Sequence, residues 1–164
     1  MFFVLLSLMT IAVSAFVYES ATQTVTQTIQ EVATLTLNNA ALGNIEEQET
    51  KSYTKTEIPA LGNVVSTTTA KNNVYLYFNS DLDSLDTYYT TYTITVKCAT
   101  VPGGSSHSVG DTVASMTIAT PDPAAVTLDI AGSWTFDFEI TTTAKSVSSD
   151  QATSATIVVT AESS

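Results

Sequence analysis

The sequence predicts an α+β protein, in which a long N-terminal hydrophobic α-helix precedes an antiparallel β-sandwich of the Ig-like type. Three observations lead to this fold class: residues 1–18 contain no charged side chain, the chain then continues to Leu37 without a proline or glycine, and short stretches of alternating apolar and polar side chains follow. Apolar side chains three or four residues apart indicate a helix, whereas a period of two indicates a half-buried strand. The expected domains are a helix over 1–37 and an all-β head over 38–164.

The first 18 residues are long enough to cross a membrane as one helix, since about 17 apolar residues are the minimum for a span. A single molecule in water could not leave this surface bare, so lipid, cleavage by a signal peptidase or copies of the same segment must remove it from water. Val13, Ser14 and Ala15 form the small-residue pattern of a peptidase site. No Lys or Arg precedes Lys51, whereas an export signal normally starts with a basic region. We therefore expect that a basic leader has already been removed.

The second half of the expected helix, residues 19–37, is amphipathic. One side of it carries an apolar stripe made of Val17, Ala21, Val25, Ile29 and Val32. Threonine at alternate positions from Thr22 to Thr28 is also compatible with a strand, because β-branched residues favour extended backbone. A strand is therefore the alternative for that stretch.

The head is expected to contain about eight short strands. The strongest patterns are Tyr88–Cys98 and Trp134–Thr141, where apolar and mainly hydroxylated side chains alternate. Weaker ones are Ser52–Ile58, Val64–Thr69, Val74–Phe78, Val113–Ala119, Ala125–Ile130 and Ala155–Ala161. Asp81–Asp86 is expected to form one helical turn, with Leu82 and Leu85 facing inward. Strands with this spacing are typical of an antiparallel sandwich or barrel.

Composition narrows the function classes. The formal net charge is -11 and only five residues are Lys or Arg, which argues against nucleic acid as a partner because phosphates bind clustered cations. Threonine and serine number 30 and 18 of the 164 residues, so the surface is expected to be neutral and rich in hydroxyls. The single cysteine, Cys98, cannot form an internal disulfide. Its place among apolar alternate positions predicts a buried, inert thiol.

Residue types that carry chemistry do not form a convincing site. Ser105, Ser106, His107, Ser108 and Asp111 are the types found in a nucleophile, base and orienting acid. They lie in one glycine-rich turn, whereas such triads normally converge from separate elements. We therefore expect no catalytic residue, no bound cofactor and no enzymatic activity.

Two further clusters have a binding interpretation and a structural one. Asn79, Asp81, Asp83 and Asp86 offer oxygen ligands for a hard cation, but the glycine and final glutamate of a standard calcium loop are missing. We favour a solvated helical turn, without a metal site. A tyrosine group could form a carbohydrate platform, although core packing or contact between copies is the favoured interpretation; its members are Tyr75, Tyr77, Tyr88, Tyr89 and Tyr92.

The order of an uncharged apolar segment, an amphipathic stretch and a β-rich head resembles type IV pilins over the whole chain. The Thr/Ser-rich head is similar to archaeal members, especially the crenarchaeal adhesion pilins, which are related to archaellins. The segments that look like the head strands of those pilins are Val101–Thr112, VPGGSSHSVGDT, and Trp134–Ser164. One position departs from the pattern, because many bacterial pilins have a register-setting glutamate where this chain has Leu5.

The resemblance implies a structural subunit of an extracellular, cell-surface type IV pilus that serves adhesion. The subunit would be inserted in the membrane, trimmed by a prepilin peptidase and assembled by the pilus machinery into a helical filament of identical copies, with apolar helices inside and β heads outside. The side chains expected to pack in the filament core are Phe2, Phe3, Val4, Leu5, Leu6, Leu8, Met9, Ile11, Val13, Phe16, Val17, Val25, Ile29 and Val32.

The outward hydroxyls suggest O-linked glycans, with β propensity as the alternative reason for so many threonines. No Asn-x-Ser/Thr acceptor exists in the chain, so any sugar must be O-linked. The candidate positions are Thr67, Thr69, Thr91, Thr93, Thr95, Thr141, Thr143, Ser146 and Ser148. The alternative function is a secreted or membrane-tethered β-sandwich surface protein, cleaved after Ala15, that binds glycans or joins a surface coat.

Overall fold

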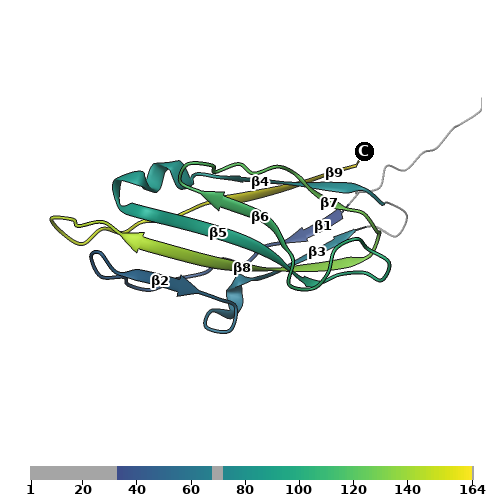
Figure 1. Ribbon diagram of the computed structural model, residues 1–164, viewed down its shortest axis with the longest axis horizontal. Helices are drawn as coiled ribbons and strands as arrows, with labels where there is room; N and C mark the ends of the chain where they lie inside the picture. Colours follow the sequence, from purple (N-terminus) through teal and green to yellow (C-terminus); the bar gives the residue numbers. More distant parts are fainter. Residues whose placement is uncertain (1–32, 68–71, 164) are drawn as a thin grey trace, which may run out of the picture. The chain divides into compact units, whose positions relative to one another are not determined.

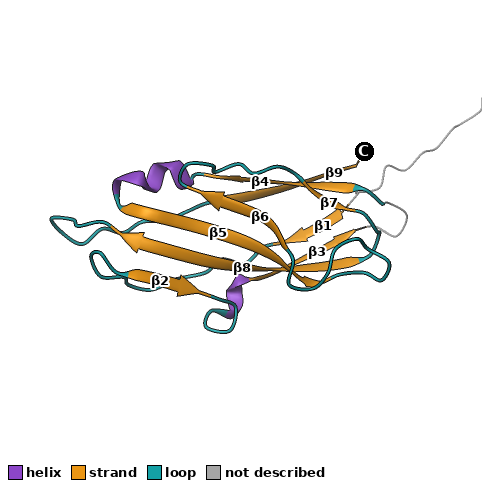
Figure 2. Ribbon diagram, viewed as in Figure 1, coloured by secondary structure: helices purple, strands orange, loops and turns teal. Residues whose placement is uncertain are grey.

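The computed structural model describes residues 33–67 and 72–163, which belong to one compact unit. These residues form nine strands and two short 3-10 helices (Figures 1 and 2). The strands are β1 Ala33–Thr36, β2 Thr50–Tyr53, β3 Gly62–Thr67, β4 Val74–Ser80, β5 Tyr89–Thr100, β6 Thr112–Thr117, β7 Val126–Leu128, β8 Ser133–Ala144 and β9 Ile157–Ser163, and the helices are η1 Pro59–Leu61 and η2 Leu82–Thr87.

The predicted α+β class, a long N-terminal helix followed by an Ig-like head, is wrong. The last residues assigned to the helix form strand β1, which pairs antiparallel with β3, so that Leu35 lies opposite Val65. Threonine at positions 34 and 36 fits an edge strand, because β-branched side chains suit a pleated surface. In the part of the chain that is described, the only helices are η1 and η2, and none is long and apolar enough for a membrane span. Residues 1–32 lie outside the described residues.

The strands form two antiparallel sheets of unequal size. The large sheet has the order β1-β3-β8-β5-β6, and the small sheet has the order β7-β4-β9. Strand β2 adds a sixth strand to the large sheet, since it pairs with the second half of β8 while β3 pairs with the first half. A six-stranded sheet that faces a three-stranded one fits a β-sandwich only in part. The predicted Ig-like arrangement is therefore wrong.

The inner faces of the two sheets share one apolar core. Alternate residues of each strand point inward, and the polar residues between them remain partly exposed. The central side chains are Trp134, Phe136, Phe138 and Ile140 of β8, Ile94, Val96 and Cys98 of β5, and Val74, Leu76 and Phe78 of β4. The Cys98 thiol is buried, as predicted, and burial raises its pKa, so it is a weak nucleophile at neutral pH.

The longest strands of the large sheet are longer than the strands of the small sheet. Part of the large sheet therefore has no small-sheet strand facing it. Strands β5 and β8 have 12 residues each, whereas β4 and β9 have 7 and β7 has 3. At about 3.3 Å per residue, the longest strands extend roughly 15 Å beyond their neighbours in the small sheet. Helix η2 covers part of this excess by burying Leu82 and Leu85, which confirms the helical turn predicted there.

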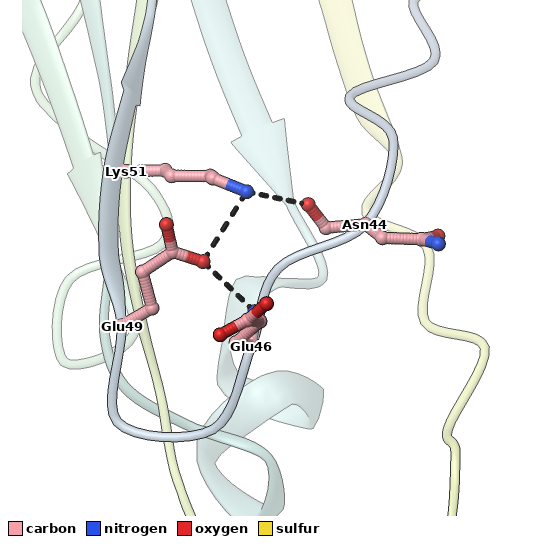
Figure 3. A network of polar contacts seen from close by, with 4 residues as sticks. All are labelled: Asn44, Glu46, Glu49 and Lys51. Atoms are coloured by element: carbon pink, nitrogen blue, oxygen red, sulfur yellow. Dashed lines mark hydrogen bonds and ion pairs between the residues drawn. The ribbon is translucent and has the colours of Figure 1, made fainter.

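A network of polar contacts fixes the turn that leads into β2 (Figure 3). The Lys51 ammonium lies 3.2 Å from a Glu49 carboxylate oxygen and donates a hydrogen bond of 2.8 Å to the Asn44 carbonyl. The same Glu49 oxygen accepts a hydrogen bond of 2.9 Å from the Glu46 backbone N–H. The contacts with Glu46 and Lys51 lower the pKa of Glu49. The network fixes this turn, and antiparallel pairing holds β2 beside β8.

Candidate functional site

The outer surface of the large sheet carries rows of hydroxyl side chains that cross several strands. One row runs through Thr50 of β2, Thr143 of β8 and Thr91 of β5. A second row runs through Ser52, Thr141, Thr93 and Thr117, and a third includes Thr95 and Ser115, with the charged Glu139 beside them on β8. We call the nine threonines and serines of these rows the hydroxyl face. Side chains directly opposite one another on paired strands lie about 5 Å apart, so the rows form a regular neutral surface.

Some of these hydroxyls satisfy one another. Thr50 and Thr143 share a hydrogen bond of 2.9 Å, and Ser52 and Thr141 share one of 3.0 Å. Thr91 is exposed, whereas Thr93 and Thr95 are half-buried between their neighbours. The hydroxyls at the edge with β2 therefore stiffen the sheet, and Thr91 is the most accessible of the candidate glycosylation positions on this face.

The remaining candidate glycosylation positions lie off the hydroxyl face. Ser146 and Ser148 follow β8 and are exposed. The Ser146 hydroxyl accepts a hydrogen bond of 2.8 Å from the Gln48 amide. The side chain of Thr67 and the whole of Thr69 lie outside the described residues, as do all predicted filament-core residues from Phe2 to Val32.

Ion pairs border the hydroxyl face. The Lys97 ammonium lies 2.7 Å from a Glu139 carboxylate oxygen, and the Lys55 ammonium lies 3.0 Å from Oδ1 of Asp137. The second pair lacks hydrogen-bond geometry, since Oδ1 of Asp137 is buried without a hydrogen-bond partner in the described part of the chain. The border charges thus neutralise each other, and the face offers uncharged hydroxyls that both donate and accept hydrogen bonds.

Ser105 and Ser106, next to His107, bind Asp129, and we call these contacts the clasp. The Ser105 hydroxyl donates a hydrogen bond of 2.6 Å to Oδ1 of Asp129, and the Ser106 backbone N–H and hydroxyl donate bonds of 2.6 and 2.8 Å to Oδ2. The His107 Nε2 lies 3.2 Å from the Thr127 carbonyl. The Ser105 hydroxyl is therefore directed at a carboxylate, and the arrangement is not that of a nucleophile activated by histidine.

The clasp ties the 101–112 loop to the strand β7 region through a carboxylate that the sequence analysis did not single out. Burial opposes ionisation of Asp129, but the hydrogen bonds from Ser105 and Ser106 outweigh it and lower the pKa of Asp129 to about 2. The His107 ring also meets the Trp134 ring edge to face, with 5.8 Å between centroids. Asp129 follows its partners by more than 20 residues, so no local sequence motif predicts that it binds them.

Asp129→Asn is expected to lower the free energy of unfolding at pH 7 by about 1 kcal/mol, since it weakens charge-assisted hydrogen bonds at a partly exposed site. The folded-state pKa of Asp129, about 2, lies below the unfolded value of roughly 3.9. The carboxylate therefore stabilises the fold above pH 4, and this contribution is lost as the pH falls toward 2. Urea unfolding of both proteins from pH 7 to pH 2 tests this, and a difference that stays constant over that range would contradict it.

Asp81, which precedes η2, and Asp86 within it bind a backbone N–H and a lysine. Oδ1 of Asp81 accepts a hydrogen bond of 2.7 Å from the Thr156 backbone N–H, and Oδ1 of Asp86 lies 3.4 Å from the Lys145 ammonium. Among the residues with described positions, no three His, Cys, Asp or Glu side chains converge on a metal site. Asp81 thus fixes the chain that enters β9.

The five predicted tyrosines do not form one platform. Tyr92 lies in the core and meets Tyr89 edge to face at 5.1 Å, and the Tyr89 hydroxyl shares a hydrogen bond of 2.8 Å with Thr153. Tyr77 lies on β4 of the small sheet and is exposed. This separation favours the packing interpretation over a shared carbohydrate surface.

No protein-family model matches the chain, and no curated protein matches it. The assignment to type IV pilins, with its membrane helix, required a long apolar helix. The described residues contain no such helix, so neither the pilin class nor the membrane helix is retained.

Proposed function

We propose that this chain is a structural subunit of an extracellular filament or coat made of identical copies, used for attachment at the cell surface. The observation that carries the proposal is the hydroxyl face, a neutral surface that spans four strands of the large sheet. Such a surface stays hydrated without charge, so copies can approach one another without the repulsion that a net charge of -11 would otherwise bring.

The apolar start of the sequence supports assembly. Residues 1–18 have no charged side chain, and a segment of that kind must be shielded from water whatever its backbone conformation. Copies of the same chain would provide such a shield by packing their apolar segments together. The β unit, with polar residues on its outer faces, is the part that meets water.

O-linked glycans are a further part of this proposal. Thr91 and Ser148 are exposed and share no hydrogen bond with another described side chain, so a sugar at either position would displace no internal contact. A neutral sugar there would extend the hydrated surface without adding charge.

Leu8→Asp is expected to abolish assembly of the native protein, because a carboxylate in the uncharged segment would be costly to bury between copies. The matched variant is Ser148→Asp, which adds the same charge to an exposed position beyond β8 and is expected to leave assembly intact. Sedimentation of the purified proteins, with electron microscopy of the pelleted material, measures the outcome. Wild-type protein that stays monomeric with residues 1–18 present, or Leu8→Asp assemblies like the wild type, would contradict the proposal.

A further inference from the structure

A cavity of about 580 Å³ lies against the inner face of the large sheet, at strands β5 and β8. Its floor is the inner face of β5 and β8, with Tyr92, Ile94, Phe138 and Ile140. Its walls are the irregular segments 37–43 and 153–156, together with the end of η1 and Ile157 at the start of β9. The volume falls in the range of about 300–1,000 Å³ that is typical of small-molecule sites.

Hydrogen bonds hold the walls in place. The Asn38 amide donates a bond of 2.9 Å to the Gly62 carbonyl, and Thr153 shares its bond of 2.8 Å with Tyr89. The Thr156 backbone is bound on both sides by Asp81, whose N–H donates to the Thr156 carbonyl and whose carboxylate accepts from its N–H. The cavity is therefore part of the folded structure.

The lining contains no charged side chain, although the chain as a whole is strongly acidic. Aliphatic and aromatic side chains make the floor, and amide and hydroxyl groups lie in the walls. A charged ligand would lose its hydration there without meeting an opposite charge. The lining thus selects for an uncharged ligand.

Tyr92 supplies a polar group inside this apolar floor. The residue is 7% exposed and lines the cavity, and its hydroxyl makes no hydrogen bond to any residue in the described ranges. Burial raises the pKa of Tyr92 to about 12, with smaller contributions from Tyr89, Tyr53 and Asp81. The hydroxyl therefore keeps its proton at neutral pH and remains a donor.

We propose that this cavity binds an uncharged molecule with a mainly aliphatic body and one oxygen acceptor, which receives a hydrogen bond from the Tyr92 hydroxyl. The aliphatic body lies against Ile94, Phe138 and Ile140 and displaces water from them. The single acceptor fixes the orientation of the ligand in the cavity. This site is on the inner side of the large sheet, so it is separate from the hydroxyl face.

Displacement of the uncharged dye Nile red from the full chain tests the proposal, with 1-dodecanol and dodecanoate as competitors at pH 7. The two competitors have the same chain length and differ in charge, so 1-dodecanol is expected to bind at least about tenfold more tightly. Tyr92→Phe removes only the hydroxyl and is expected to weaken 1-dodecanol binding about three- to tenfold, the effect of one hydrogen bond. Tyr77→Phe, the same change at an exposed tyrosine, is the matched control.

Two substitutions of wall residues are designed to fill the cavity. Ala155→Trp places a large side chain at a half-buried lining position, and Ala40→Trp does so at an exposed one, where folding is not at risk. Both are expected to abolish displaceable dye binding, whereas Ala119→Trp at an exposed position outside the cavity is expected to leave it unchanged. Residues 1–18 are the same in all these variants, so dye bound to that segment contributes equally to each measurement and does not affect the difference between variants. Equal competition by the two compounds, or full binding by folded Ala155→Trp and Ala40→Trp proteins, would overturn the proposal.

Discussion

Trp134→Ala is expected to lower the free energy of unfolding by about 4 kcal/mol, the usual cost of removing a buried tryptophan or phenylalanine side chain. Trp134 is fully buried at the start of β8. Its ring stacks on Phe136 with 6.2 Å between centroids, and its indole N–H donates a hydrogen bond of 3.0 Å to the Ile130 carbonyl. The substitution removes the ring and leaves that carbonyl without its donor, so both packing and hydrogen bonding are lost.

Removal of the Trp134 ring is also expected to weaken the clasp, because the His107 ring packs against the indole. Urea unfolding of the full chain, followed by far-ultraviolet circular dichroism, measures the change, since the chain has no other tryptophan to report by fluorescence. Tyr77→Ala removes an exposed aromatic ring from β4 and is expected to change stability by less than about 0.5 kcal/mol. A Trp134→Ala protein as stable as the Tyr77→Ala protein would show that Trp134 does not anchor the core.

The central strands were predictable because their residues alternate over a long stretch. The patterns at Tyr88–Cys98 and Trp134–Thr141 correspond to β5 and β8, which extend two or three residues further at their C-terminal ends. Each strand buries every second side chain, so local sequence and tertiary burial carry the same signal. The outward positions of Thr93, Thr95 and Thr141 followed from the same pattern.

Strand β1 was missed because its residues fit two periods. The apolar residues before Leu37 recur at helical spacing, yet threonine at alternate positions equally fits a strand. Pairing with β3, some 30 residues further along the chain, decides for the strand. Local propensity cannot reveal that partner, because its effect depends on tertiary contact.

The features of the candidate sites depend on contacts that the sequence does not display. Ser52 and Thr141 are 89 residues apart, and only the register between β2 and β8 brings their hydroxyls together. The cavity lies between β5, β8 and the segments 37–43 and 153–157, which are far apart in the sequence and meet only in the folded chain. The sequence thus predicted which residue types face outward, but not the pairs or the cavity that they form.

Leu82→Ala is expected to destabilise the protein by about 3 kcal/mol, because removal of a buried leucine side chain loses its burial and leaves a cavity. Leu82 is fully buried, and Leu85 lies beside it on the inward side of η2. Helix η2 contacts β5 and β6, so the substitution removes packing between the helix and the large sheet. A helix of only 6 residues has little stability of its own and depends on this packing.

The matched control for Leu82→Ala is Asp83→Ala, which changes an exposed residue of the same helix and is expected to leave stability within about 0.5 kcal/mol of the wild type. Urea unfolding gives both free energies, and hydrogen exchange locates the effect. The Tyr88 N–H, which donates a bond of 3.0 Å to the Leu85 carbonyl at the end of η2, is expected to exchange faster in Leu82→Ala than in Asp83→Ala. Equal stability and equal exchange in the two variants would mean that η2 lies on the sheet without closing the core.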